Sequence, residues 1–296
     1  MTVPPRSRSF AVADRHVRIA LGIICAAMAL AALLFILQVP WALALWPYTG
    51  RTQLSNIFIA SIFLAAAGSG GWCLLTRSDR GLSGIALDSI LIFTPFAIFS
   101  VAVAVVDRNV SVGLFAAVSA AGTLLAVWLL RWSLRHPWRD PRPTPRPVRV
   151  AFGLFVGALW VASTLLILQV PKVLPWPVTP QLSTLYGLMF LGASGYFLYG
   201  IVVPRWENAG GQLTGFLMYD LVLAVPLLRE LTAPGKNSLY DPGTGASPSL
   251  NLVIYAAVVI GSGLLALWYL VGRREYRPWN RAVVDGDLAA GDAPPA

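Results

Sequence analysis

The chain has 296 residues, of which 57% are hydrophobic and only 12% are charged, and its formal net charge is +9 at pH 7. Soluble domains carry about 25% charged residues, so this composition excludes an ordinary soluble protein. The basic residues lie mainly in short segments between long apolar runs, which indicates membrane orientation. Nucleic-acid binding is not expected, because the chain has no soluble module that could hold a nucleic acid.

The sequence consists of two similar halves. Residues 36–40, Ile-Leu-Gln-Val-Pro, return letter for letter as residues 167–171, and residues 17–22 return in related form as residues 148–153. Self-similarity at a long period indicates duplication. We therefore predict an all-α membrane protein with eight transmembrane helices, arranged as two tandem four-helix repeats.

Several apolar runs approach the ~20 residues needed to cross the hydrocarbon core of a bilayer. The sequence predicts spanning helices at residues 19–37, 54–75, 82–106, 112–130, 150–170, 182–203, 213–230 and 249–271. The corresponding divisions are a disordered basic tail at 1–18, repeat 1 at 19–130, an Arg/Pro-rich linker at 131–149, repeat 2 at 150–272 and a tail at 273–296. The acidic end of that last tail, residues 282–296, is expected to be disordered.

The distribution of basic residues predicts the orientation. With eight spans, both termini and the linker lie on the same side, and placing that side in the cytoplasm leaves only Arg51, Arg108, Lys172, Arg229 and Lys236 outside. The positive-inside rule therefore predicts a multi-pass protein of the bacterial inner membrane with both termini cytoplasmic. Since each repeat has an even number of spans, the two should insert the same way up, related by a pseudo-twofold axis along the membrane normal.

Small residues mark the faces expected to pack closely. Gly22 and Ala26 lie four residues apart in the first predicted helix, and Gly153 and Gly157 lie at the same spacing in its duplicate. This spacing suits either dimerisation or packing within one bundle, and the recurrence in both halves favours packing within the bundle. Runs of small residues at 65–71 and 192–195 should likewise be buried against neighbouring helices. Cys25 and Cys73 lie within apolar runs and are expected to be packing residues.

Loops rich in tryptophan and proline follow the first helix of each half. Trp41, Trp46 and Trp176 are expected to lie at the headgroup level. The second copy reads Trp-Pro-x-Thr-Pro-x-Leu from Trp176 to Leu182, and this segment resembles one found in uncharacterised bacterial multi-pass membrane proteins. The resemblance implies a membrane protein and brings no activity with it.

Two aspartates are the main candidates for chemistry. Asp88 and Asp220 each follow a Leu-[Ser/Thr]-Gly segment and precede a proline, Pro95 or Pro226, in a predicted spanning helix. An acidic side chain at the bilayer centre costs about 2.5–3.5 kcal/mol on insertion scales, so such residues are functional or paired. The aspartates are interpreted either as the lining of an ion or solute path, or as acceptors that fix helix packing.

The helix predicted at 213–230 differs from its counterpart at 82–106. Its apolar part is shorter than the ~30 Å hydrocarbon core, and it carries Arg229 and Glu230 in addition to Asp220. These three charges and Asp88 are the predicted path residues. The alternative is local thinning of the bilayer with Arg229 extended towards the interface. The loop at 231–248 could be a lid, a partner contact or a slack connection, and a slack connection is the default interpretation.

The linker offers a second candidate site. Its arginines could bind anionic lipid headgroups at about 1 kcal/mol per charge, or could serve only to set orientation. The candidates are Arg131, Arg135, Arg139, Arg142, Arg146 and Arg149.

No catalytic motif, cofactor motif or metal-ligand pattern is present in the sequence. His16 and His136 are interpreted as solvated loop residues. The protein is therefore not expected to be an enzyme, and two functions remain open. One is transport of an ion or small solute past the helices at 82–106 and 213–230. The other is a non-catalytic accessory or scaffold role in a membrane complex, with a membrane-protein partner or a second copy of the chain.

Overall fold

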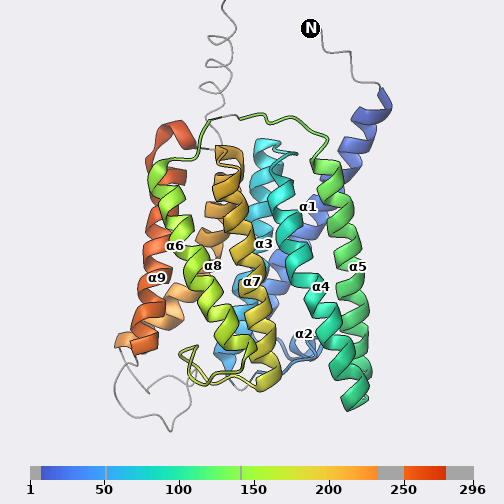
Figure 1. The fold of residues 1–296 in the computed structure, drawn as a ribbon, viewed down its shortest axis with the longest axis vertical. Helices are drawn as coiled ribbons and strands as arrows, with labels where there is room; N and C mark the ends of the chain where they lie inside the picture. The colour runs from blue at the N-terminus through green and yellow to red at the C-terminus, as the bar shows by residue number, and fades with distance from the viewer. Residues whose placement is uncertain (1–7, 51, 141, 233–249, 278–296) are drawn as a thin grey trace, which may run out of the picture.

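The computed structural model describes residues 8–50, 52–140, 142–232 and 250–277, which form a helical bundle without β-strands (Figure 1). Eight of its helices are long and apolar enough to cross a membrane, which confirms the prediction of an all-α membrane protein. In chain order the elements are α1 (Arg8–Ile36), α2 (Pro40–Ala44), α3 (Gln53–Thr76), α4 (Leu82–Asp107), α5 (Val110–Ser133), α6 (Arg146–Ile167), α7 (Pro180–Val202), α8 (Trp206–Thr232), α9 (Leu250–Leu267), η1 (Trp268–Gly272) and η2 (Arg274–Tyr276).

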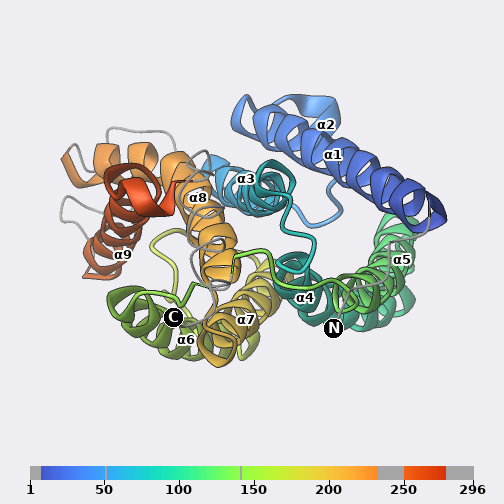
Figure 2. The same ribbon diagram turned by 90° about the horizontal axis from the view of Figure 1, so that it is seen from above.

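The helices pack as four antiparallel hairpins, and each hairpin of one half packs against a hairpin of the other half. Within the halves, α1 packs on α3, α4 on α5, α6 on α7 and α8 on α9. Between the halves, α3 packs on α8 and α4 packs on α7, as the view along the bundle shows (Figure 2). The contacts between α3 and α4, and between α7 and α8, are much smaller. Each half therefore completes its packing against the other half.

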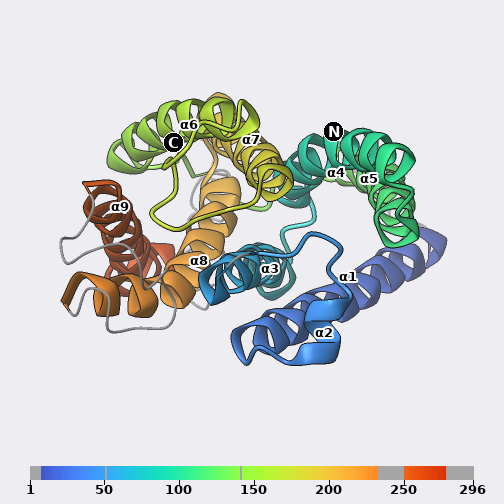
Figure 3. The same cartoon turned by 90° about the horizontal axis from the view of Figure 1, so that it is seen from below.

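The two ends of the bundle differ in what they carry. The start of α1, the junction between α5 and α6 and the end of α9 all lie at one end, the upper end in Figure 1. The short α2 lies beside α1 at the opposite end (Figure 3). We call the first the junction end and the second the far end.

Helix α8 is longer than the sequence predicts. The prediction of a short helix at 213–230 is wrong, because α8 begins at Trp206 and continues to Thr232. At 1.5 Å per residue the observed helix is about 40 Å long, which is enough to cross the bilayer without thinning it. The extension is buried against its neighbours, with Trp206, Glu207, Asn208 and Gln212 each 2% exposed or less.

The small residues of α3 and α7 lie at helix contacts, as predicted. Ala67, Ser69 and Gly70 of α3 are buried, and the Cys25 sulfur of α1 packs against Gly70. A Cβ atom added at Gly192 of α7 would lie only 2.2 Å from Ile92 of α4.

The packing prediction for Gly153 and Gly157 of α6 is wrong. Both glycines are exposed on the outside of the bundle. An added Cβ atom at either position would meet nothing within 4 Å. The close contact of α6 with α7 is made further along the helix, where Ser163 donates a hydrogen bond to the carbonyl of Gly187 at 2.8 Å.

Two of the loop tryptophans point inward. Trp46 packs edge-on against Phe35, Phe63 and Phe115, with ring centroids 5.2–6.4 Å apart, and Trp176 is only 3% exposed. Their rings therefore pack inside the bundle, where large aromatic surfaces gain from burial, and their place at the headgroup level stays a prediction. Trp41, by contrast, is 62% exposed.

Several predicted boundaries shift. Helix α1 already begins at Arg8, where the sequence predicts a tail, and Arg18 forms a salt bridge with Asp79 beside the start of α4. The linker shortens because α5 continues to Ser133 and α6 begins at Arg146. The predicted slack loop at 231–248 and the predicted disordered tail at 282–296 lie outside the described residues, except for the end of α8.

Gly187→Ala should destabilise the bundle, whereas Gly153→Ala should not. A Cβ atom at Gly187 would lie 2.8 Å from the backbone oxygen of Ser163, so α6 and α7 would have to separate. Overpacking of this kind costs about 1–3 kcal/mol, while alanine in an open helical position gains about 0.5–1 kcal/mol over glycine. Thermal unfolding of the purified protein in detergent measures both. Equal midpoints for the two variants would contradict the observed α6–α7 contact.

Candidate functional site

The start of α8 is held by the segment that joins the two halves. Pro143 and Arg205 form an antiparallel backbone bridge, and the amide of Trp206 donates to the carbonyl of Arg142 at 2.8 Å. The first amides of a helix have no acceptor within the helix itself. The junction therefore supplies a hydrogen-bond acceptor at the start of α8. This acceptor allows α8 to begin at residue 206, seven residues before the start at 213 that the sequence predicts.

Trp206 anchors this start among other aromatic rings. It is 1% exposed and lies edge-on to Trp72 of α3, with ring centroids 6.3 Å apart. On its other side lies Tyr276 of η2, with ring centroids 4.4 Å apart. Residues from both halves and from the C-terminal end of the bundle thus meet at one indole ring.

Glu207 fastens the junction to α8. Its carboxylate oxygen Oε2 accepts the backbone N–H of Arg139 at 2.8 Å and of Asp140 at 3.1 Å. The side chain is 2% exposed, and Ser78 from the α3–α4 loop also interacts with it. Since charge-assisted hydrogen bonds to an ionised acceptor are among the stronger ones, Glu207 connects three segments that are far apart in sequence.

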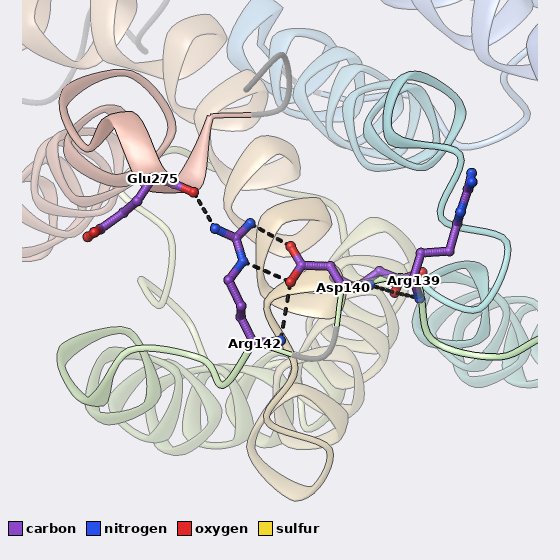
Figure 4. A network of polar contacts seen from close by, with 5 residues as sticks. Arg139, Asp140, Arg142 and Glu275 are labelled. Carbon is purple, nitrogen blue, oxygen red and sulfur yellow. Dashed lines mark hydrogen bonds and ion pairs between the residues drawn. The ribbon is translucent and has the colours of Figure 1, made fainter. Parts of the chain in front are cut away.

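Arg142 completes this network on the side of η2 (Figure 4). Its Nε and Nη2 atoms donate to the two carboxylate oxygens of Asp140 at 2.8 and 2.6 Å, and its Nη1 donates to the carbonyl of Glu275. The guanidinium also lies 5.6 Å from the ring centre of Tyr276. Arg142, a predicted lipid contact, is therefore engaged by the protein itself.

The other arginines of the predicted lipid site remain on the surface of the junction end. All of them are exposed, and they surround the point where α5 ends and α6 begins: Arg131, Arg135, Arg139, Arg146 and Arg149.

Below the junction network, polar side chains continue into the bundle along α8. Gln212 is 1% exposed and donates from Nε2 to the carbonyl of Tyr196 on α7. Ser69 of α3 donates to the carbonyl of Gly211 at 3.0 Å. An added Cβ at Gly211 would lie 3.3 Å from the Tyr196 hydroxyl. This cluster occupies the contact of α3, α7 and α8.

Some polar atoms in this cluster have no hydrogen-bond partner. They are the Nε1 of Trp72 and the acceptor oxygens of Asn208 and Gln212. A buried polar group without a partner costs about 1–3 kcal/mol, so such groups are usually satisfied by water, an ion or a ligand. The arrangement offers more acceptors than donors, which suits a cation, a proton or a solute rich in N–H and O–H groups.

Asp88 lies on α4 and faces α7. Its Oδ1 atom is buried without a hydrogen-bond partner, 3.0 Å from the position of a Cβ at Gly192. The glycine makes room for the carboxylate, because any larger residue there would fill the space. At 1.5 Å per residue, Asp88 lies about 9 Å along α4 from Leu82, towards the junction end of the membrane.

Asp220 lies on α8 and faces α9. It is 4% exposed, and its Oδ2 atom lies 3.5 Å from the position of a Cβ at Gly263. The structure thus places the two aspartates in different helix contacts, α4–α7 and α8–α9. They do not converge on one point.

Arg229 and Glu230 lie near the far end of α8 and point in different directions. Arg229 is exposed, whereas Glu230 is buried at 6%. Of the three charged residues that the sequence predicts as path residues on this helix, Asp220 and Glu230 lie inside the bundle and Arg229 lies on its surface.

The interpretation of His136 as a solvated residue is wrong. Its Nδ1 lies 3.0 Å from the carbonyl oxygen of Trp132 and its Nε2 lies 3.3 Å from Asp14, and the imidazole lies tilted against the Trp132 ring with ring centroids 4.3 Å apart. The contact with Asp14 fixes the start of α1 to the junction. Within the described residues, no three His, Cys, Asp or Glu side chains gather as a metal site would require.

Sequence reasoning missed Glu207, Asn208, Gln212, Trp72 and Tyr196. Aligning α8 with α4 placed residues 206–212 in a loop, and the pair Gly210-Gly211 also argues against a helix. One available signal was Glu207 itself, since acidic residues are favoured in the first turn of a helix. A Cβ at Gly210 would lie 2.1 Å from Trp72, so the glycine allows α3 and α8 to approach.

The chain matches no protein-family model, and it shows no significant similarity to a curated protein or to a solved structure.

Glu207→Ala should loosen the junction. The change leaves the amides of Arg139 and Asp140 without their acceptor, and hydrogen bonds to charged groups contribute about 1.5–3 kcal/mol. We expect trypsin to cut the purified protein after Arg135 and Arg139 several-fold faster than in the wild type, as about 1.4 kcal/mol corresponds to a factor of ten in a local opening equilibrium. Glu207→Gln, which retains an acceptor oxygen, should show a smaller effect.

The matched control is Glu275→Ala. Arg142 binds the backbone carbonyl of Glu275 and not its side chain, which is 54% exposed. Its cleavage rate should equal that of the wild type. If Glu207→Ala is also cut at the wild-type rate, the carboxylate does not hold the junction.

Proposed function

We propose that this protein is a transporter of an ion or small polar solute in the bacterial inner membrane, with its path along α8 and beside α4. The observation that carries the proposal is the burial of polar side chains along the whole of α8. They run from the junction end to the far end: Glu207, Asn208, Gln212, Asp220 and Glu230.

Helix packing alone gives no reason for this pattern. The counterpart helix α4 buries only two hydroxyl side chains, Ser83 and Ser100, besides the half-buried Asp88. Polar and ionisable residues within a span are costly, and those facing the interior of a bundle mark ion and substrate paths. The unpartnered acceptor oxygens of Asn208 and Gln212 support a cargo that can donate hydrogen bonds or carry positive charge.

We further infer that the two halves are tandem repeats related by a pseudo-twofold axis along the membrane normal. The support is the reciprocal packing of α3 on α8 and of α4 on α7, which exchanging the halves leaves unchanged. In this arrangement the polar α8 and the plainer α4 occupy equivalent positions. The path would then be an asymmetric feature within a symmetric frame, as in transporters built from repeats.

The junction end is proposed to face the cytoplasm. It gathers the exposed arginines of the linker, and cytoplasmic loops carry an excess of Lys and Arg. These side chains would lie at the level of anionic lipid headgroups, each contributing about 1 kcal/mol.

An accessory role in a membrane complex is the second candidate. It is favoured by the outer face of α6, where Gly153 and Gly157 leave room for the close approach of another helix. If this function is right, Gly153→Leu should abolish a functional complex while the isolated protein keeps its thermal midpoint.

The orientation is tested by labelling single cysteines in a background in which Cys25 and Cys73 are replaced by alanine. Ser111→Cys, exposed at the far end, should react with an impermeant maleimide in intact cells. Arg135→Cys, exposed at the junction end, should react only after permeabilisation. The reverse pattern would place the termini outside.

The path is tested by flux through the full-length protein in liposomes. Currents after jumps of Na⁺, K⁺ or proton concentration report ions, and liposome swelling reports neutral solutes. Asp220→Asn should reduce flux at least about tenfold, because a lost charged contact of about 1.5–3 kcal/mol corresponds to that factor or more. Asp88→Asn, at the shallower position on the plainer helix, should reduce it less.

Both variants should insert and unfold at the wild-type temperature. If both instead lose folded protein to the same extent, the aspartates are packing elements and the proposed path is wrong.

A further inference from the structure

Asp220 occupies the middle of the span. It lies about 21 Å from the start of α8 and about 18 Å from its end at 1.5 Å per residue. Its side chain is 4% exposed, and neither carboxylate oxygen has a hydrogen-bond partner. An ionised carboxylate in such a position would be expensive, because burying an unpaired charge costs far more than burying a neutral polar group.

The groups around Asp220 provide no positive charge. From α9 it is faced by Ser262 and Gly263. Among titratable groups, Tyr219 on α8 interacts with Asp220, and Tyr219 in turn lies near Tyr255 on α9 and Tyr186 on α7. From α3, Phe58 packs on Tyr219 with ring centroids 6.1 Å apart. No arginine, lysine or histidine among the described residues contributes to the electrostatic surroundings of the carboxyl group.

The Ser262 hydroxyl lies within reach of two carbonyl oxygens of its own helix, so it is available to Asp220 as a hydrogen-bond acceptor. A serine hydroxyl has a single hydrogen and two acceptor lone pairs. The Ser262 hydroxyl donates to the carbonyl oxygen of Val258 at 2.7 Å. Its remaining lone pairs can therefore be used only by a donor, and Asp220 is a donor only when its carboxyl group carries a proton.

A bound metal cation fits this site poorly. Hard cations take several oxygen ligands, whereas among the described residues Ser262 is the one whose side-chain oxygen interacts with the Asp220 carboxyl group. The tyrosine hydroxyls of Tyr219 and Tyr255 are bound to each other.

We propose that Asp220 is a proton-binding site at the middle of the membrane, and that transport by this protein is linked to proton binding and release there. The inference rests on the proposed function. In the packed state the neutral carboxyl group donates to Ser262. When water reaches it between α8 and α9, the carboxyl group releases its proton and becomes a carboxylate, so the only change is the loss or gain of one proton.

The proposal is tested by infrared difference spectroscopy of the purified full-length protein in lipid nanodiscs. The spectrum of the wild type minus that of Asp220→Asn should contain the carbonyl band of a protonated carboxylic acid at neutral pH. That band should lose its intensity as the pH is raised. The matched control is Asp107→Asn at the exposed end of α4, whose spectrum should retain the carboxylic-acid band because this variant leaves Asp220 unchanged.

Ser262→Ala gives a second measurement that leaves Asp220 in place. Removing the acceptor should shift the carboxylic-acid band to higher frequency, since a free carbonyl group absorbs above a hydrogen-bonded one. An unchanged frequency in this variant would show that Ser262 does not bind the proton of Asp220. Ionised carboxylate bands for Asp220 at neutral pH, or bands that respond to Na⁺ and not to pH, would overturn the proposal.

Flux measured on the same preparations separates this inference from the proposed function. If the protonated band is present but no ion or solute moves, the transporter proposal fails and the proton site stands. If solute moves while Asp220 is ionised or its substitution leaves the proton dependence of flux unchanged, the transporter stands and the proton-linked inference fails.

Discussion

A helix that crosses hydrocarbon has no water to satisfy its polar groups, so every polar side chain it buries must find a partner in the protein or remain a cost. Helix α8 is where this constraint acts most strongly. It buries Glu207, Asn208, Gln212, Asp220 and Glu230, whereas α3, α7 and α9 bury serine and threonine hydroxyls but no carboxylate or amide side chain. The position of α8, held by α3 on one side and α9 on the other, depends on how those groups are satisfied.

The junction satisfies the first of them. Glu207 accepts hydrogen bonds from two backbone amides of the linker, and the backbone amide of Trp206 donates to the carbonyl of Arg142. A segment that reads as an orientation signal is therefore also part of the fold. Its arginines divide into two groups, because Arg142 is engaged by Asp140 and η2 whereas the others remain exposed.

The two halves of the chain place their intramembrane aspartates in different helix contacts. Each half contributes one hairpin to each side of the bundle, with α4 packed on α7 and α8 packed on α3. Yet Asp88 faces Gly192 on α7, and Asp220 faces Gly263 on α9. A shift of one position along a helix turns a side chain by about 100°, so two aspartates that are one residue out of register point towards different neighbours.

The sequence by itself determined the class of the protein, the number of spans and the close-packed faces of α3 and α7, because apolar length and small residues act locally. It also identified Asp88 and Asp220 as unusual, since a charge in an apolar run is visible without a structure. Only the tertiary structure decided that residues 206–212 extend α8, because that depends on an acceptor and a carboxylate contact supplied by the distant linker. The inward turn of Trp46 and Trp176, the exposure of Gly153 and Gly157 and the separation of the two aspartates were decided in the same way, since each depends on which helix lies opposite.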